Sequence, residues 1–182
     1  FFLFSGSSPE IVEHCIKDNF KSYLNKELIK PIDNGMAAGH FFYHNKMFSH
    51  RNPLATTNDY DYYVRCVDRF NNDLNNKNLF IITVIEEPEK RKNWSKGFVF
   101  DFGLPNIKND HGIESLISTL VNVAPLSKIF IIRHRNSDIP YININQYNDH
   151  MLDISIGNIG ESTGVFFLHP FDDYIVKSIF NT

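Results

Sequence analysis

The sequence contains very little cysteine, and this absence argues against one class of protein. Its only two cysteines, Cys15 and Cys66, lie inside helical patterns rather than in a series of spaced pairs. Small disulfide-stabilised secreted domains depend on such a series, so the pattern favours a protein that keeps its thiols reduced. We therefore expect a cytoplasmic location.

Long apolar runs and a large excess of one charge are missing as well. The longest apolar run, Leu79–Ile85, falls far short of the roughly 20 residues that a membrane-spanning helix requires. The opening "FFLF" is too short for the core of a signal peptide, and no basic residue precedes it. The formal net charge of -3 provides no general attraction for a phosphate backbone. We therefore expect neither a membrane nor a nucleic acid as a partner.

What is present is an ordinary globular composition. Hydrophobic residues make up 42% and charged residues 21% of the 182 residues, close to the average of folded domains. This length suits one domain with a substantial core better than two. We expect a single α/β domain over residues 1–182. Because the chain begins without methionine, we also expect it to be an excised or N-terminally truncated part of a longer chain.

The spacing of apolar residues predicts the elements of this domain. Helical spacing runs from about Ser8 to Asn25, from Thr57 to Leu74 with Thr57 or Asn58 as its cap, and through "GIESLISTLVNVA". Two continuous apolar segments, "NLFIITVIEE" and "KIFIIRH", are typical of buried parallel strands. "YINI", "MLDISI" and "GVFFLHP" predict strands in the last third, and "DDYIVKSIF" predicts a short closing helix. The predicted fold class is therefore α/β, with three layers in which helices flank a mostly parallel sheet, and with a strand-rich C-terminal third.

The carboxyl ends of the two buried strands form the first candidate site. Glu86 follows the first strand, and Arg133, His134 and Arg135 stand at the end of the second. Ligands of open α/β sheets usually bind beyond these ends, and two arginines suit a phosphate or an acidic sugar. We therefore consider these four residues candidate ligand-binding residues, with a simple solvated strand end as the structural alternative.

The histidine-rich stretch "HFFYHNKMFSHRNP" forms the second candidate site. It holds His40, His44 and His50, follows a predicted loop over Lys26–Gly39, and begins with the strand-like "HFFYH". A zinc site would need further ligands, yet the sequence has neither a cysteine pair nor an HExxH motif, so we expect no metal and no cofactor. His44 and His50 are candidate catalytic bases, because imidazole titrates near neutral pH.

Cys15 is the candidate nucleophile of the sequence. Its neighbour His14 cannot act as the base for the Cys15 thiol through helix geometry alone, because adjacent helical residues point about 100° apart. Tertiary packing would have to bring another imidazole to the thiol. The alternative is an inert thiol on the buried face of the helix.

Three segments resemble a known family. "SSPEIVEHCIKDNFKSYL", "HNKMFSHRNPL" and "DYDYYVRCVDRFNNDL" are similar to the predicted papain-like cysteine peptidases of bacteria and large DNA viruses. The resemblance covers roughly Ser8 to Ile85 and implies a hydrolase, with His50 in "FSHRNP" as the best-matched base or ligand contact. The family's opening motif with Gly and Cys, its nucleophile region, would fall before Phe1, and its "PFDW" is replaced by "FFLF". Viral membership would place the protein in the host cytoplasm or in the virion.

Three functions remain open at this point. The first is a hydrolase of the cysteine-peptidase-like kind, with His50 as base. The second is a domain that modifies glycans or nucleotide sugars and binds an anionic or glycan substrate through Arg133, His134 and Arg135, because family members often occur beside glycosyltransferase-like proteins. The third is a non-enzymatic structural or interaction module in which the histidine-rich stretch is packed surface.

Overall fold

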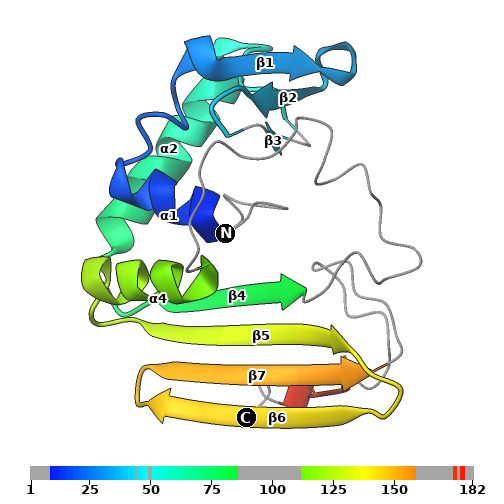
Figure 1. Cartoon of the computed structure of the whole chain (residues 1–182). Coiled ribbons are helices and arrows are strands. Elements are labelled where there is room, and N and C mark those ends of the chain that lie inside the picture. The colour runs from blue at the N-terminus through cyan, green and yellow to red at the C-terminus, as the bar shows by residue number, and fades with distance from the viewer. Residues whose placement is uncertain are drawn as a thin grey trace. The chain divides into compact units, whose positions relative to one another are not determined.

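The computed structural model describes residues 9–43, 45–48, 51–85, 112–158, 174–175 and 177–178 (Figure 1). The chain divides into two compact units. We call residues 1–76 and 96–126 the N-terminal unit, and residues 77–95 and 127–182 the sheet unit. Chain length predicted a single domain, and whether the two units belong to one domain stays a prediction.

The N-terminal unit combines helices with a small antiparallel sheet. Its elements are α1 (Pro9–Lys17), η1 (Lys26–Leu28), β1 (Ile29–Ile32), η2 (Asp33–Gly35), β2 (Ala37–His40), β3 (Asn45–Phe48), α2 (Thr57–Asp73) and α4 (Gly112–Val123). The strands follow the order β1-β2-β3, and both strand pairs are antiparallel. This sheet was not predicted, because we expected a loop over Lys26–Gly39.

The hairpin between β1 and β2 turns on residues that tolerate left-handed backbone. Asp33, Asn34 and Gly35 have φ angles of 51°, 56° and 85°. Asp, Asn and Gly adopt this conformation at least cost, so the segment forms a tight turn instead of an irregular loop. β2 then ends at His40 and residues 41–43 form a turn, so the strand predicted for "HFFYH" is wrong over those three residues. The turn that follows buries Tyr43 completely.

Helix α1 ends earlier than its apolar spacing predicted. Asn19 and Phe20 have φ angles of 54° and 59°, so the helix cannot continue to Asn25 as expected. The Phe20 N–H donates to the Cys15 carbonyl over 2.7 Å, and the Asn19 N–H donates to the Ile16 carbonyl over 3.2 Å. This pair of bonds is a Schellman C-cap, in which Asn is the usual substitute for Gly. Asn19 was therefore the stop signal that the apolar pattern concealed.

Helix α2 begins where the sequence predicted, at Thr57, although its cap is one residue earlier. The Thr56 hydroxyl oxygen accepts the Asp59 N–H over 3.2 Å, so Thr56 is the N-cap in place of Thr57 or Asn58. Cys66 and Val67 on this helix are buried in the core of the unit.

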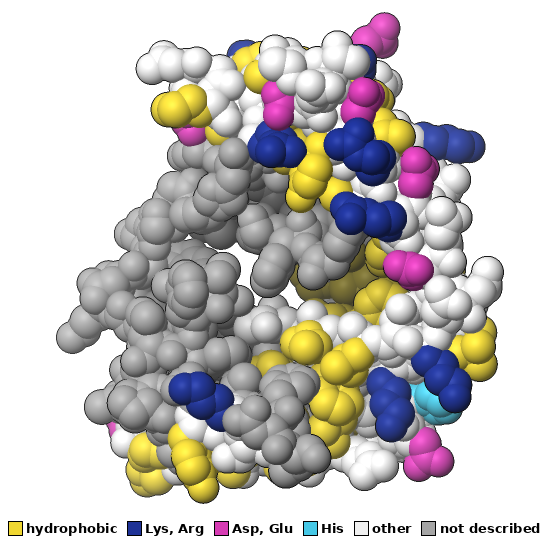
Figure 2. Space-filling model, turned by 180° about the vertical axis from the view of Figure 1, so that it is seen from behind, with side chains coloured by type: hydrophobic (Ala, Val, Ile, Leu, Met, Phe, Trp, Pro, Cys, Tyr) yellow, Lys and Arg dark blue, Asp and Glu magenta, His cyan; other side chains and the backbone are white. Residues whose placement is uncertain are grey.

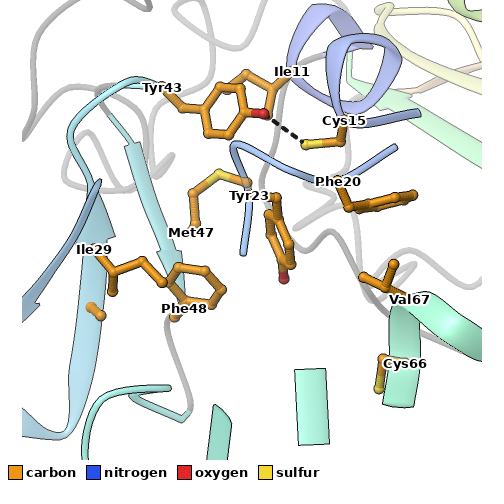
Figure 3. Packing of buried hydrophobic residues seen from close by; sticks show 11 residues of the cluster. Ile11, Cys15, Phe20, Tyr23, Ile29, Tyr43, Met47, Phe48, Cys66 and Val67 are labelled. Atoms are coloured by element: carbon orange, nitrogen blue, oxygen red, sulfur yellow. Dashed lines mark hydrogen bonds between the residues drawn. The ribbon is translucent and has the colours of Figure 1, made fainter. Parts of the chain in front are cut away.

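That core is rich in aromatic rings (Figure 3). Its buried members are Ile11, Cys15, Phe20, Tyr23, Ile29, Ala38, Tyr43, Met47, Phe48, Cys66 and Val67. Edge-on ring contacts join Phe48 to Tyr63 at 5.0 Å and Phe20 to Phe70 at 5.4 Å between centroids. Such contacts add to the hydrophobic stabilisation of burial and favour one packing arrangement.

The sheet unit contains the parallel strands that the sequence predicted. Its strands are β4 (Leu79–Ile85), β5 (Lys128–Asn136), β6 (Tyr141–Asn148) and β7 (Met151–Asn158), in the order β4-β5-β7-β6. β4, β5 and β7 are parallel, and β6 is antiparallel to β7. Ile132, Ile154 and Ile156 form a buried cluster against which Leu152 and Ile175 pack.

These observations confirm the α/β class in its general form, with helices and two sheets. They also confirm the strands predicted for "YINI" and "MLDISI", and residues 174–175 and 177–178 are helical as expected. The strand predicted for "GVFFLHP" lies outside the described residues, and the three-layer arrangement stays a prediction. Among the described residues, none of the helices has the length and apolar character needed to cross a membrane.

Candidate functional site

The N-terminal unit brings a thiol, a phenol and an imidazole together. His14 and Cys15 belong to α1, whereas Tyr43 belongs to the turn after β2. The Tyr43 hydroxyl oxygen lies 3.2 Å from Cys15 Sγ and 3.1 Å from His14 Nδ1. Figure 3 shows the first of these hydrogen bonds. The spatial cluster therefore contains a tyrosine that the sequence pattern did not single out.

The three groups can form a directed chain of hydrogen bonds. The Cys15 thiol donates to the Tyr43 oxygen. The Tyr43 hydroxyl then donates to His14 Nδ1, which requires the neutral His14 ring to carry its proton on Nε2. The His14 side chain is 31% exposed, so the chain runs from the core to a partly solvated imidazole.

Cys15 is poorly suited to nucleophilic chemistry in this position. Its side chain is completely buried. Burial raises the pKa of the Cys15 thiol to about 12, and the Tyr43 hydrogen bond offsets only part of that rise. Because the thiolate is the reactive form, almost none of it exists at neutral pH. This geometry favours the inert core thiol that the sequence left open as an alternative.

His40 is the second unusual imidazole of this unit. It is completely buried, its Nε2 lies 2.9 Å from the Ser22 carbonyl, and its ring centroid lies 4.5 Å from that of Tyr43. Among the described residues, its Nδ1 has no hydrogen-bond partner. Burial lowers the pKa of His40, against smaller opposing effects of the Ser22 carbonyl and of Asp18. His40 therefore acts as a neutral core residue that donates one hydrogen bond from Nε2.

We expect the free energy of unfolding to decrease on acidification because of His40. Its folded pKa lies below the ordinary 6.5, so the unfolded chain takes up the proton first as the pH falls. The stabilisation by neutral His40 is fully present above 6.5 and is lost as the pH falls toward the folded pKa. Urea midpoints at about pH 7.5 and about pH 5.5 should differ more for the wild type than for His40→Gln. Equal pH dependence in the two proteins would contradict this assignment.

The neighbours of His50 are firmly anchored, although His44 and His50 themselves lie outside the described residues. The Arg51 carbonyl accepts the Tyr63 hydroxyl over 2.9 Å. The Arg51 guanidinium lies 4.4 Å from the centroid of the Tyr62 ring, and its Nε lies 3.4 Å from a carboxylate oxygen of Asp59. The residue after His50 is thus tied to α2 through both its backbone and its side chain.

Asn52 supplies a second anchor to the same segment. Its Nδ2 donates to the Gly35 carbonyl over 3.0 Å, and its Oδ1 accepts the Leu54 N–H over 2.8 Å. Asn52 is 5% exposed, and on the other side of His50 the ring of Phe48 is buried as well. The Asn-Pro pair, which is typical of a turn, was the signal from which this anchor could have been predicted.

At the rim of the sheet unit, the predicted anion-binding residue Arg133 is paired with a carboxylate. Arg133 Nε lies 2.8 Å from a carboxylate oxygen of Asp153, and the two side chains are 20% and 5% exposed. Arg135 is exposed, the backbone of His134 is in register with Ile85 and Ile156, and Glu86 lies outside the described residues. The positive charge of Arg133 is already balanced within the sheet. Arg133 and Arg135 are two positions apart on β5 and therefore share one face of the strand.

Charged side chains elsewhere on the surface are mixed in sign. On the face seen in Figure 2, basic and acidic side chains of the described residues alternate. A shallow groove of about 380 Å³ on α2 is lined by Tyr62, Arg65, Asp68 and Arg69. The Arg69 guanidinium bends back to Cys66, donating to its Sγ over 3.3 Å. Within the described part of the chain, no three His, Cys, Asp or Glu side chains are placed to hold a metal ion.

No model of a protein family matches this chain, and neither curated proteins nor solved structures yield a match. The assignment of function therefore depends on the residues and on their geometry.

Proposed function

We propose that this chain is a hydrolase-type α/β domain of the papain-like cysteine peptidase class, with His50 as its general base. The similarity of the segments between Ser8 and Ile85 to that family supports the proposal. The observation that carries it is the anchoring of the residues on both sides of His50, with Phe48 1% exposed and Asn52 5% exposed.

Anchoring of this kind is what a general base needs. A base must hold its nitrogen within hydrogen-bond reach of the proton that it removes, and loss of that geometry is costly. Arg51 and Asn52 are bound to Tyr63 and Gly35 at 2.9 and 3.0 Å, which restricts the backbone directly after His50. A loop held on a packed scaffold is the common location of catalytic residues.

The nucleophile in this proposal is not Cys15. Cys15 is buried with a pKa raised to about 12 by burial, and Cys66 is 3% exposed in the same core. The proposal leaves the nucleophile unassigned, and His50 removes the proton of the group that attacks the carbonyl carbon. A nucleophilic thiol of the peptidase type would belong to the family's opening motif, which does not occur among residues 1–182.

Other parts of the proposal concern the setting of the chain. Cys15 and Cys66 are both free thiols, which supports a reducing environment such as the cytoplasm or a virion assembled there. We also propose that helices flank the parallel sheet in three layers. We further propose that the protein has no nucleic-acid partner. The glycan-modifying alternative is weaker, because Arg133 is already paired with Asp153 at 2.8 Å.

The test compares His50→Ala and His50→Gln with the wild type on chromogenic esters and fluorogenic peptides. We expect the alanine variant to lose about a hundredfold or more of the turnover rate, since general base catalysis is worth about that much. His150→Ala, in which another imidazole is removed from the sheet unit, should keep the wild-type rate.

Two results would argue against the proposal. Unchanged turnover in His50→Ala would remove His50 from the chemistry. Absence of hydrolysis by the wild type across the whole panel would favour the structural or interaction module.

A further inference from the structure

Strand β6 is an unusually exposed edge of the sheet unit. Among the described strands it pairs only with β7, at the end of the order β4-β5-β7-β6 (Figure 1). Every residue from 142 to 148 is exposed, on both faces of the strand. Ile142, Ile144 and Tyr147 expose 38%, 54% and 61% of their surface.

The sequence of β6 has none of the features that normally protect an edge. "YININQYN" contains no charged residue, no proline and no glycine. Soluble proteins usually place lysine, proline or a short strand at such a position, because unpaired N–H and C=O groups invite another strand. Ile and Tyr also favour extended pairing. The combination points to a strand that is covered in the working protein.

We propose that β6 pairs antiparallel with the β6 of a second copy of this chain, which joins the two four-stranded sheets into one. A twofold axis perpendicular to the sheet relates the two copies. Under this symmetry, each face of one sheet continues into the same face of the other sheet. Even-numbered residues of one β6 therefore lie opposite even-numbered residues of the other, and odd-numbered residues lie opposite odd-numbered ones.

The side chains of β6 are self-complementary under this symmetry. In a register centred on Ile144, this residue faces its own copy, and Asn143 faces Asn145 of the second copy. Isoleucine then packs on isoleucine on one face, while paired amides exchange hydrogen bonds on the other. Because β6 carries no charge, two copies meet there without like-charge repulsion in spite of the net charge of -3. A strongly charged peptide would find no counter-charge on this strand.

The size of the contact predicts a weak dimer. Eight residues of antiparallel strand span about 27 Å, and a sheet is about 10 Å thick, so the edge buries on the order of 550 Å² in total. Stable interfaces usually bury about 1,200 Å² or more. We therefore expect a weak, reversible dimer that forms only at high protein concentration.

Sedimentation velocity of the full chain tests this proposal between about 10 μM and about 1 mM. We expect the mean mass to rise from that of the 21.2 kDa monomer toward that of a dimer. Ile144→Lys places two like charges opposite each other at the centre and should remain monomeric. Met36→Lys adds the same charge at a residue that is 72% exposed in the N-terminal unit, and should dimerise as the wild type does.

A pair of double variants tests the register. Asn143→Lys with Asn145→Lys sets like charges opposite each other twice and should abolish the dimer. Asn143→Lys with Asn145→Glu sets opposite charges across the same interface and should dimerise at least as strongly as the wild type. Circular dichroism spectra that match the wild type show that each variant is folded.

Three outcomes would overturn the proposal. The first is a wild type that stays monomeric up to about 1 mM. The second is a dimer that persists in folded Ile144→Lys, which would place the interface elsewhere. The third is growth into fibres without a dimer plateau, which would mean that β6 pairs with a different strand of the next copy.

Discussion

Replacement of Tyr43 by alanine is expected to lower the free energy of unfolding of the N-terminal unit by about 4 kcal/mol. The Tyr43 side chain is completely buried and belongs to the main hydrophobic cluster. The substitution removes a ring that packs against His40 and Phe42, with centroids 4.5 and 5.2 Å away, and leaves a cavity in the cluster. Urea unfolding followed by circular dichroism measures the loss.

Tyr43→Phe is the matched control, because it keeps the ring and removes only the hydroxyl. Without the hydroxyl, the Cys15 thiol and His14 Nδ1 lose their shared partner. We expect a cost of about 1 kcal/mol, the usual value of one hydrogen bond. If the two variants were equally stable, the ring would contribute no packing energy and the assignment of Tyr43 to the core would be wrong.

Replacement of Glu13 by alanine is expected to cost about 3 kcal/mol. Glu13 of α1 is 3% exposed, and its carboxylate accepts hydrogen bonds from Ser115 at 2.6 Å and Thr119 at 3.2 Å on α4. It also pairs with Lys17. The substitution leaves the hydroxyl groups of Ser115 and Thr119 without this acceptor. Amide hydrogen exchange of α1 and α4 should accelerate together in the variant.

Glu13→Gln and a pH series provide the controls for this prediction. Glutamine keeps an acceptor oxygen of the same reach, so its cost should be clearly smaller. Burial alone would raise the pKa of Glu13, but the hydrogen bonds from Lys17 and Ser115 outweigh it and hold the pKa below the ordinary 4.5. The corresponding stabilisation is present above pH 4.5 and is lost as the pH falls through the folded pKa. A wild type and a glutamine variant with the same response to acid would contradict this role.

The helical and strand segments with a clear apolar period were the most predictable parts of the fold. α2 begins at Thr57 as expected, and β4 and β5 are parallel neighbours as the continuous apolar runs indicated. The period of side chains along an element depends only on its local backbone geometry, so a pattern in the sequence is enough to detect it. The antiparallel sheet β1-β2-β3 was missed because its short strands have no such period and are joined by turns that resemble a loop.

The candidate sites depended on contacts that no local pattern contains. Cys15 and His14 meet Tyr43 only because the turn after β2 packs against α1, which gives the thiol a pKa of about 12 through burial. Arg133 was chosen as an anion-binding residue from its place at a strand end. Its pairing with Asp153 follows from the order of β5 and β7 in the sheet, which the sequence does not display.

By itself, the sequence determined that this is a mixed α/β chain with few thiols, no long apolar run and a histidine-rich stretch followed by an Asn-Pro turn. Tertiary structure decided which of these residues are chemically available. Cys15 and His40 became buried core residues, Asn52 became the anchor beside His50, and β6 became an exposed edge. The physical reason is that burial, pKa and strand order arise from contacts between residues far apart in the chain, whereas periodicity arises between neighbours.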